Sequence, residues 1–150
     1  MAEPDLVAEP LFDEPLVVAA GFESPWAKRR NLTLADLKEE PWVLAQPGSL
    51  ARSLQDEAFR LSGLDVPAAT VLTVSLHLYM RVIETGRWLG LVPASVMRFG
   101  GKQLRIKALP VKLLSPPAPV GIVTIKDRTL TPLAERFIDC ARKVAKSARS

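Results

Sequence analysis

Two serines that begin helical segments could help to bind a small anion. Gln46-Pro47-Gly48-Ser49 and Ser75 each follow a short apolar run and precede residues at helical spacing. Each position would bring together a hydroxyl, free backbone N–H groups and the positive end of a helix dipole, which suits a carboxylate. Taken alone, the residues favour the alternative that both serines only cap their helices.

Patterns for catalysis are weak. Gly100-Gly101-Lys102 is similar to the end of a phosphate-binding loop, but Val96 replaces the first glycine and Gln103 replaces the Ser or Thr that would hold magnesium, so we predict a turn. The single histidine, His77, lies one position off the apolar stripe of its helix and is expected to be a surface or partly buried residue. No serine lies in a G-x-S-x-G elbow and no G-x-G-x-x-G is present. We predict no catalytic residue.

One cysteine excludes an internal disulfide and cannot make a zinc site alone. The spacing of Cys140 from Phe137, Ala141 and Val144 predicts a core thiol on the inner face of a helix. No carboxylates cluster near His77 in the sequence, so we predict neither a metal site nor a cofactor.

The composition is that of one globular domain. Its 150 residues are 48% apolar and 24% charged, with a net charge of +4. No apolar run approaches the length of a membrane span, and the first 20 residues are acidic where a signal peptide is basic, so we expect a cytoplasmic protein with no membrane contact. The basic residues near the C-terminus indicate a solvated helix face better than a nucleic-acid site, because no aromatic residues are interleaved with them.

The expected strands are short and apolar. We predict residues 1–10 as a frayed lead-in, 115–119 as an extended connector, and strands at 15–21, 42–45, 70–74, 88–92, 104–109 and 120–125.

Helices are expected between these strands. Thr33 and Asp36 form a capping-box pattern, Ser49 begins a helix that ends before Gly63, and Ser75 begins one that ends at Gly86. A helical turn is predicted over 94–99 and a last helix from Pro132. The predicted inner stripes are Leu50, Leu54, Ala58 and Leu61; Leu76, Tyr79, Met80 and Ile83; and Leu133, Phe137, Ala141 and Val144. This alternation predicts an α/β fold with a mostly parallel sheet covered by helices on both faces.

Short motifs in a fixed order resemble the effector-binding domain of LysR-type transcriptional regulators. They are Leu11-Phe12-Asp13-Glu14-Pro15, Ser24-Pro25, Leu32-Thr33-Leu34-Ala35-Asp36-Leu37, Glu40-Pro41-Trp42-Val43, Pro47-Gly48-Ser49 with Arg52, Thr73 with Ser75, Leu91-Val92-Pro93, Leu109-Pro110-Val111, Pro119-Val120-Gly121-Ile122-Val123-Thr124 and Leu130-Thr131-Pro132.

The resemblance implies a type 2 periplasmic-binding-protein-like fold. One complete α/β subdomain would span 22–107, and 1–15 with 112–150 would form the remnant of another, joined by two crossing strands. A small, anionic effector would lie in the cleft between them, with contacts at Gln46, Pro47, Gly48, Ser49, Ser75 and Pro93. The helix at 49–62 and the strand at 70–74 would match the family's dimer-forming elements.

The resemblance begins partway into that domain, so we expect an N-terminally truncated fragment. DNA binding would then need an N-terminal helix-turn-helix domain that this chain lacks. The partly uncovered strand at 120–125 and last helix predict self-association. The leading interpretation is an effector-sensing, dimerising part of a bacterial regulator. The alternatives are a solute-binding protein and a small α/β enzyme, for which a titratable group near His77, Ser49 or Ser75 would be the sign.

Overall fold

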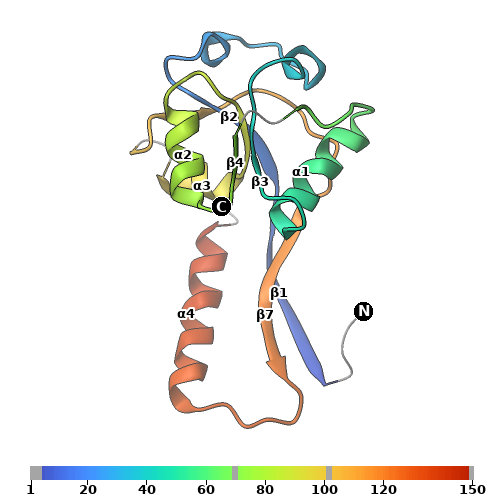
Figure 1. Ribbon diagram of the computed structural model, residues 1–150. Coiled ribbons are helices and arrows are strands. Elements are labelled where there is room, and N and C mark those ends of the chain that lie inside the picture. Colours follow the sequence, from blue (N-terminus) through green and yellow to red (C-terminus); the bar gives the residue numbers. More distant parts are fainter. Residues whose placement is uncertain (1–4, 69–70, 101–102, 149–150) are drawn as a thin grey trace. The chain divides into compact units, whose positions relative to one another are not determined.

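The computed structural model describes residues 5–68, 71–100 and 103–148, and these divide into two compact units (Figure 1). Unit 1 contains residues up to Glu14 and from Pro117 onward, and unit 2 spans Pro15–Pro116. The chain therefore passes from unit 1 into unit 2 and back again. The expected second subdomain, 22–107, lies inside unit 2.

Unit 2 is built on strands whose pairing is mixed. Three of them form an antiparallel sheet in the order β5 (Gly90–Pro93), β2 (Leu16–Gly21), β6 (Ile106–Ala108), and β3 (Val43–Ala45) pairs in parallel with β4 (Val71–Thr73). A parallel bridge between Trp42 and Leu89 connects β3 to the start of β5. The prediction of a mostly parallel sheet was therefore wrong. The apolar run of β2 indicates that both faces of the strand are covered, but it does not indicate whether the neighbouring strands are parallel or antiparallel to it.

Helices cover these strands on two sides, as predicted. Phe59 of α1 (Leu50–Leu61) packs in one buried cluster with Val18, Trp42 and Leu91. Tyr79, Met80 and Ile83 of α2 (Leu76–Glu84) pack in a second cluster with Ala19, Val43, Val92 and Ile106. Neighbouring strand residues thus face opposite layers, with α1 on one side of β3 and α2 on the other (Figure 1).

The predicted helix signals are confirmed at several positions. Ser49 and Ser75 accept hydrogen bonds from the amides of Arg52 and Leu78, and Gly63 and Gly86 adopt positive φ just beyond α1 and α2. Thr33 and Asp36 make the reciprocal capping-box bonds beside the short 3-10 helix η2 (Ala35–Leu37). The remaining helices of unit 2 are η1 (Pro25–Lys28) and α3 (Ala94–Gly100), so Gly100 belongs to a helix; Thr70, Gly101 and Lys102 lie outside the described residues.

The buried stripe of α1 differs from the prediction. Gln55, Ala58 and Phe59 are buried, whereas Leu50 is 78% exposed and Leu61 also reaches solvent. The prediction chose the stripe of α1 that contains the leucines. The stripe that is buried is the adjacent one, which has Gln55 at its centre. In α2 the prediction holds for Tyr79, Met80 and Ile83, but Leu76 is exposed.

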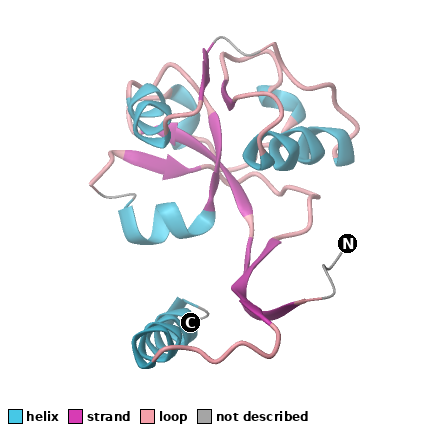
Figure 2. Cartoon of the chain, turned by 60° about the horizontal axis from the view of Figure 1, so that its bottom comes forward, coloured by secondary structure: helices cyan, strands magenta, loops and turns pink. Residues whose placement is uncertain are grey.

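Unit 1 consists of a two-stranded antiparallel ladder and one helix (Figure 2). Its elements are β1 (Leu6–Glu14), β7 (Ala118–Ile125) and α4 (Pro132–Ala148). The predicted frayed lead-in was wrong from Leu6 onward, and the end of the predicted connector belongs to β7. The strand was not predicted because it contains Pro10, and a proline argues against a regular strand. Pro10 lies where the β1–β7 register shifts, and a proline is tolerated at such an irregularity.

The apolar face of α4 is only partly buried. Ile138 and Ala145 are buried, while Leu133, Phe137 and Val144 of the predicted inner stripe are exposed. Cys140 is exposed as well, so it is not the predicted core thiol. The apolar arc of this helix is wide enough to hold two stripes at helical spacing, and the prediction took the one with larger side chains.

A bidentate ion pair joins α4 to β1. Arg142 donates from Nε and Nη2 to the two carboxylate oxygens of Glu9 at 2.9 and 2.8 Å, and from Nη1 to Asp139 at 3.0 Å. The hydrogen bond from Arg142 lowers the pKa of Glu9 below its ordinary value of 4.5. The pair therefore stabilises unit 1 above that pH, and its contribution is lost as the pH falls through the folded-state pKa.

We expect an NMR titration of the Glu9 carboxyl to give a midpoint below 4.5 in the parent chain and a return toward 4.5 in Arg142→Met. Asp139→Asn is the matched control, because it removes the other carboxylate from Arg142 and leaves the bidentate pair in place. An unchanged midpoint in Arg142→Met would show that the pair does not persist in solution.

Within the described residues, no helix is both long enough and apolar enough to cross a membrane.

Candidate functional site

A cavity of about 200 Å³ opens in unit 2 where the strands end and the helices begin. The carboxyl ends of β3, β4 and β5 and the first turns of α1 and α2 surround it. Its lining is mostly aliphatic, with Thr73, Ser75, Gln55 and Tyr79 as its polar side chains: Ala45, Ala51, Gln55, Thr73, Val74, Ser75, Leu76, Tyr79, Leu91, Val92 and Pro93. Ligands of open α/β sheets collect at such strand ends.

The cavity begins where the pairing of β3 with β5 stops. Beside the Trp42 bridge the ladder is regular, because the Leu89 amide donates to Pro41 O and the Val43 amide donates to Leu89 O, both at 2.9 Å. The next bonds of a parallel ladder would join Leu91 N to Val43 O and Ala45 N to Leu91 O. Side chains take the places of these partners.

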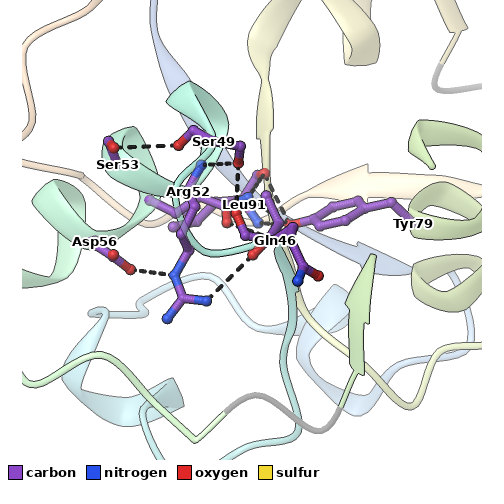
Figure 3. Close-up of polar contacts among 9 residues, drawn as sticks. Gln46, Ser49, Arg52, Ser53, Asp56, Tyr79 and Leu91 are labelled. Carbon is purple, nitrogen blue, oxygen red and sulfur yellow. Dashed lines mark hydrogen bonds and ion pairs between the residues drawn. The ribbon is translucent and has the colours of Figure 1, made fainter. Parts of the chain in front are cut away.

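Gln55 and Tyr79 supply the replacement bonds. The Gln55 carbonyl accepts from Ala45 N at 2.9 Å, and its amide donates to Leu91 O at 3.3 Å and to the Tyr79 hydroxyl at 3.1 Å. Tyr79 reaches from α2 to Leu91, where its hydroxyl accepts from the backbone amide at 3.0 Å and donates to the carbonyl at 3.1 Å (Figure 3). A side chain from each helix therefore binds the backbone between the two strands.

Gln55, Tyr79 and Leu91 form the floor of the cavity, and these bonds occupy most of the hydrogen-bond donors and acceptors of the two side chains. The Tyr79 hydroxyl has its one donor and two acceptor positions occupied, and both amide hydrogens of Gln55 are committed. Burial raises the pKa of Tyr79 far above its ordinary value of 10.0, and the bonds with Leu91 and Gln55 offset this only in part. The floor therefore stays uncharged at neutral pH and offers aliphatic and satisfied polar surface.

Of the six predicted effector contacts, Ser75 and Pro93 line the cavity. Gln46, Pro47, Gly48 and Ser49 lie between two lining residues, Ala45 and Ala51, and are not themselves in the lining. Ser49 donates to Gln46 O at 2.8 Å and accepts from the Arg52 amide, so its hydroxyl closes the turn and caps α1 (Figure 3).

Arg52 supports the same turn. Its guanidinium donates to Asp56 at 2.5 Å and to Ala45 O at 3.3 Å, so it braces the end of β3 against α1 (Figure 3). Ser75 is held similarly, because its amide donates to the Thr73 hydroxyl and its own hydroxyl accepts from Leu78 N. Arg52 N and Leu78 N are bonded to the capping serines, so the other amides of each first turn, which have no intrahelical acceptor, are the donors available to a ligand.

Sequence reasoning missed Gln55 as a part of this site and assigned Tyr79 only to the core. A signal for Gln55 was present, since it lies one turn after Ala51 and one turn before Phe59, on the buried face of α1. A polar residue at the centre of an apolar stripe must find buried partners, and such a position predicts a specific hydrogen-bond network.

The groups that the sequence analysis considered for catalysis are not brought together in the described residues. His77 is exposed on α2, and the hydrogen bonds of the Ser49 and Ser75 hydroxyls go to backbone groups instead of a titratable side chain. In the part of the chain that the structure describes, no three His, Cys, Asp or Glu residues are grouped as a metal site.

This chain is similar in sequence to known transcriptional regulators. The family model "LysR substrate binding domain" matches residues 2–146. The chain belongs to this family. It is 29% identical to the HTH-type transcriptional regulator GalR of Pseudomonas putida over 140 residues, and 28% identical to the DNA-binding transcriptional dual regulator OxyR of Escherichia coli over 138 residues. These matches cover 93% and 90% of this chain but only 35% and 43% of the two relatives.

Solved structures show the fold of this LysR-family chain. The regulatory domain of CcmR from Synechocystis, in complex with 2-PG, superposes with a TM-score of 0.77 at 22% identity, covering 97% of this chain and 72% of that one. The effector-binding domain of QuiR in complex with shikimate gives a TM-score of 0.71 at 20% identity, covering 97% and 68%. The predicted type 2 periplasmic-binding-protein-like α/β fold is thereby confirmed.

Proposed function

We propose that this chain is the effector-sensing and dimerising part of a bacterial LysR-type transcriptional regulator. The observation that carries the proposal is the cavity at the carboxyl ends of β3, β4 and β5, beside the first turns of α1 and α2. The ligand is a small anionic metabolite whose charged group meets Ser75 and the free amides of these turns, while its apolar part lies on the floor. CcmR with 2-PG and QuiR with shikimate support a small-molecule ligand.

Binding would act by shifting a conformational equilibrium that exists without the ligand. The ligand favours whichever state gives it more contacts, and the size of the shift is limited by its difference in affinity for the two states. DNA contact belongs to another part of the full-length protein, in keeping with the relatives named as HTH-type regulators. We place the protein in the cytoplasm, where such regulators act.

Isothermal calorimetry against small carboxylates and amino acids, with shikimate and 2-PG among them, tests the ligand proposal. We expect one class of these probes to bind, and Ala51→Phe to weaken that binding on the order of 100-fold, or about 2.7 kcal/mol, because the ring would occupy the cavity. Ser53→Phe is the matched control, since Ser53 is exposed on the same helix and does not line the cavity. Flat titrations of a folded sample with every probe would contradict effector sensing.

We also propose that the chain self-associates through the apolar surface of unit 1. Leu133 and Phe137 of α4 are 78% and 72% exposed, and Val123 and Ile125 of β7 also reach solvent. An apolar surface of this kind favours burial against another protein surface. α1 and β4, with Leu50 and Leu72 exposed, are proposed as the dimer-forming elements of unit 2.

Sedimentation equilibrium of the full chain tests the association through unit 1. We expect Phe137→Glu to weaken association by roughly ten-fold or more, because a charge replaces a central aromatic group. Phe137→Leu keeps the surface apolar and should associate like the parent. A chain that stays monomeric at high concentration, with α4 folded, would rule this proposal out.

A further inference from the structure

The polar pair Gln55 and Tyr79 occupies the position of a missing β-ladder. At the Trp42 bridge β3 and β5 are joined by two backbone hydrogen bonds, yet two residues further on Ala45 N and both backbone groups of Leu91 bond to side chains. Both side chains are buried and come from helices on opposite sides of the strands.

We propose that Gln55 and Tyr79 form a wedge that holds β3 and β5 apart and thereby keeps the ligand cavity open. Without the wedge, Ala45 N and both backbone groups of Leu91 would lose their side-chain partners, and Ala45 N with Leu91 O and Leu91 N with Val43 O would be complementary pairs in ladder register. A buried backbone group without a partner is costly, so the strands would close until these groups bonded to each other. The space between the ends of β3 and β5 would then be closed, and the cavity would be lost.

The wedge also fixes the helix starts. Gln55 lies about one and a half turns into α1 and Tyr79 one turn into α2, and the bond between their side chains links the two helices beneath the cavity. Both are positioning residues, because their polar groups are committed to the protein and not to a ligand. The importance of the wedge for sensing rests on the proposed function, but its existence can be tested without any ligand.

Amide hydrogen exchange of the full chain tests the wedge. In Tyr79→Phe the ring remains and Gln55 still bonds to both strands, so the strands stay apart while the Leu91 amide loses its acceptor. We therefore expect the Leu91 amide to exchange about ten-fold faster relative to the Leu89 amide, which bonds in the intact ladder. Ile83→Val is the matched control, since Ile83 is one turn further along the buried face of α2 and makes no polar contact with the strands; both amides should then change by the same factor. An unchanged ratio in Tyr79→Phe would overturn the proposal.

A crystal structure of the Gln55→Ala, Tyr79→Phe double variant is the second test. We expect new bonds from Leu91 N to Val43 O and from Ala45 N to Leu91 O, with loss of the cavity. Strands that remain apart would show that something other than these side chains separates them. If the double variant does not fold, the exchange ratio in Tyr79→Phe alone decides. A flat calorimetric titration together with a raised exchange ratio would reject effector sensing and leave the wedge standing.

Discussion

Trp42→Ala is expected to lower the free energy of unfolding by about 3 to 5 kcal/mol, the usual range for deleting a buried aromatic side chain. Trp42 is fully buried, and its ring meets that of Phe59 edge to face at 5.1 Å. Its indole nitrogen donates to Leu37 O at 2.9 Å, so the variant also removes the partner of that carbonyl. Urea unfolding followed by far-ultraviolet circular dichroism measures the loss.

The control for Trp42→Ala is Leu114→Ala. Leu114 is an apolar residue of unit 2 with 59% of its surface exposed and lies outside α1 and β4, so its truncation should change stability by no more than about 0.5 kcal/mol. A small effect of Trp42→Ala would mean that α1 and the strands are not packed around this ring.

Gly21→Ala should be nearly as damaging, by about 3 kcal/mol, through overpacking instead of a cavity. A β-carbon at Gly21 would lie 2.7 Å from Glu84 O, Gly86 N and Ile83 O. These are backbone atoms at the end of α2, which cannot rotate away as a side chain can. The same urea experiment measures the effect.

Gly63→Asn is the control for Gly21→Ala. Gly63 has φ +70°, and a β-carbon added there would meet no other atom within 4 Å. Asparagine tolerates that conformation, so the loss should stay below about 1 kcal/mol. Parent-like stability of Gly21→Ala would mean that α2 does not end against β2.

Local chemistry in this sequence predicted local structure well. The Ser49 and Ser75 caps, the Thr33 and Asp36 box and the helix ends before Gly63 and Gly86 all depend on residues within one turn of each other, and all are present. Strand direction, and which apolar stripe of a helix is buried, depend on partners that are far away in sequence. That is why the mixed sheet and the buried faces of α1 and α4 were missed.

The residues that line the candidate cavity could be expected only in part, for the same reason. Ser75 follows from the rule that ligands gather at strand ends and Pro93 from the family resemblance, and both line the cavity. Gln55, Tyr79 and the backbone of Leu91 meet across 24 and 12 residues of sequence, and their arrangement exists only because a ladder stops. The spacing within α1 indicates that Gln55 is buried and needs polar partners, but it does not indicate which partners these are.

Both passages of the chain between the units occur at prolines. The β1–β7 register ends at the pair Glu14 and Ala118, and the β2–β5 register begins at Leu16 with Pro93, so Pro15 lies between the two registers, and its carbonyl accepts from Ala94 N at 2.9 Å. Its ring, like that of Pro117 at the return, fixes φ and restricts the residue before it. Each crossing therefore contains a torsion that the covalent ring already restricts in the unfolded chain, so less backbone entropy is lost there on folding than at an ordinary linker residue.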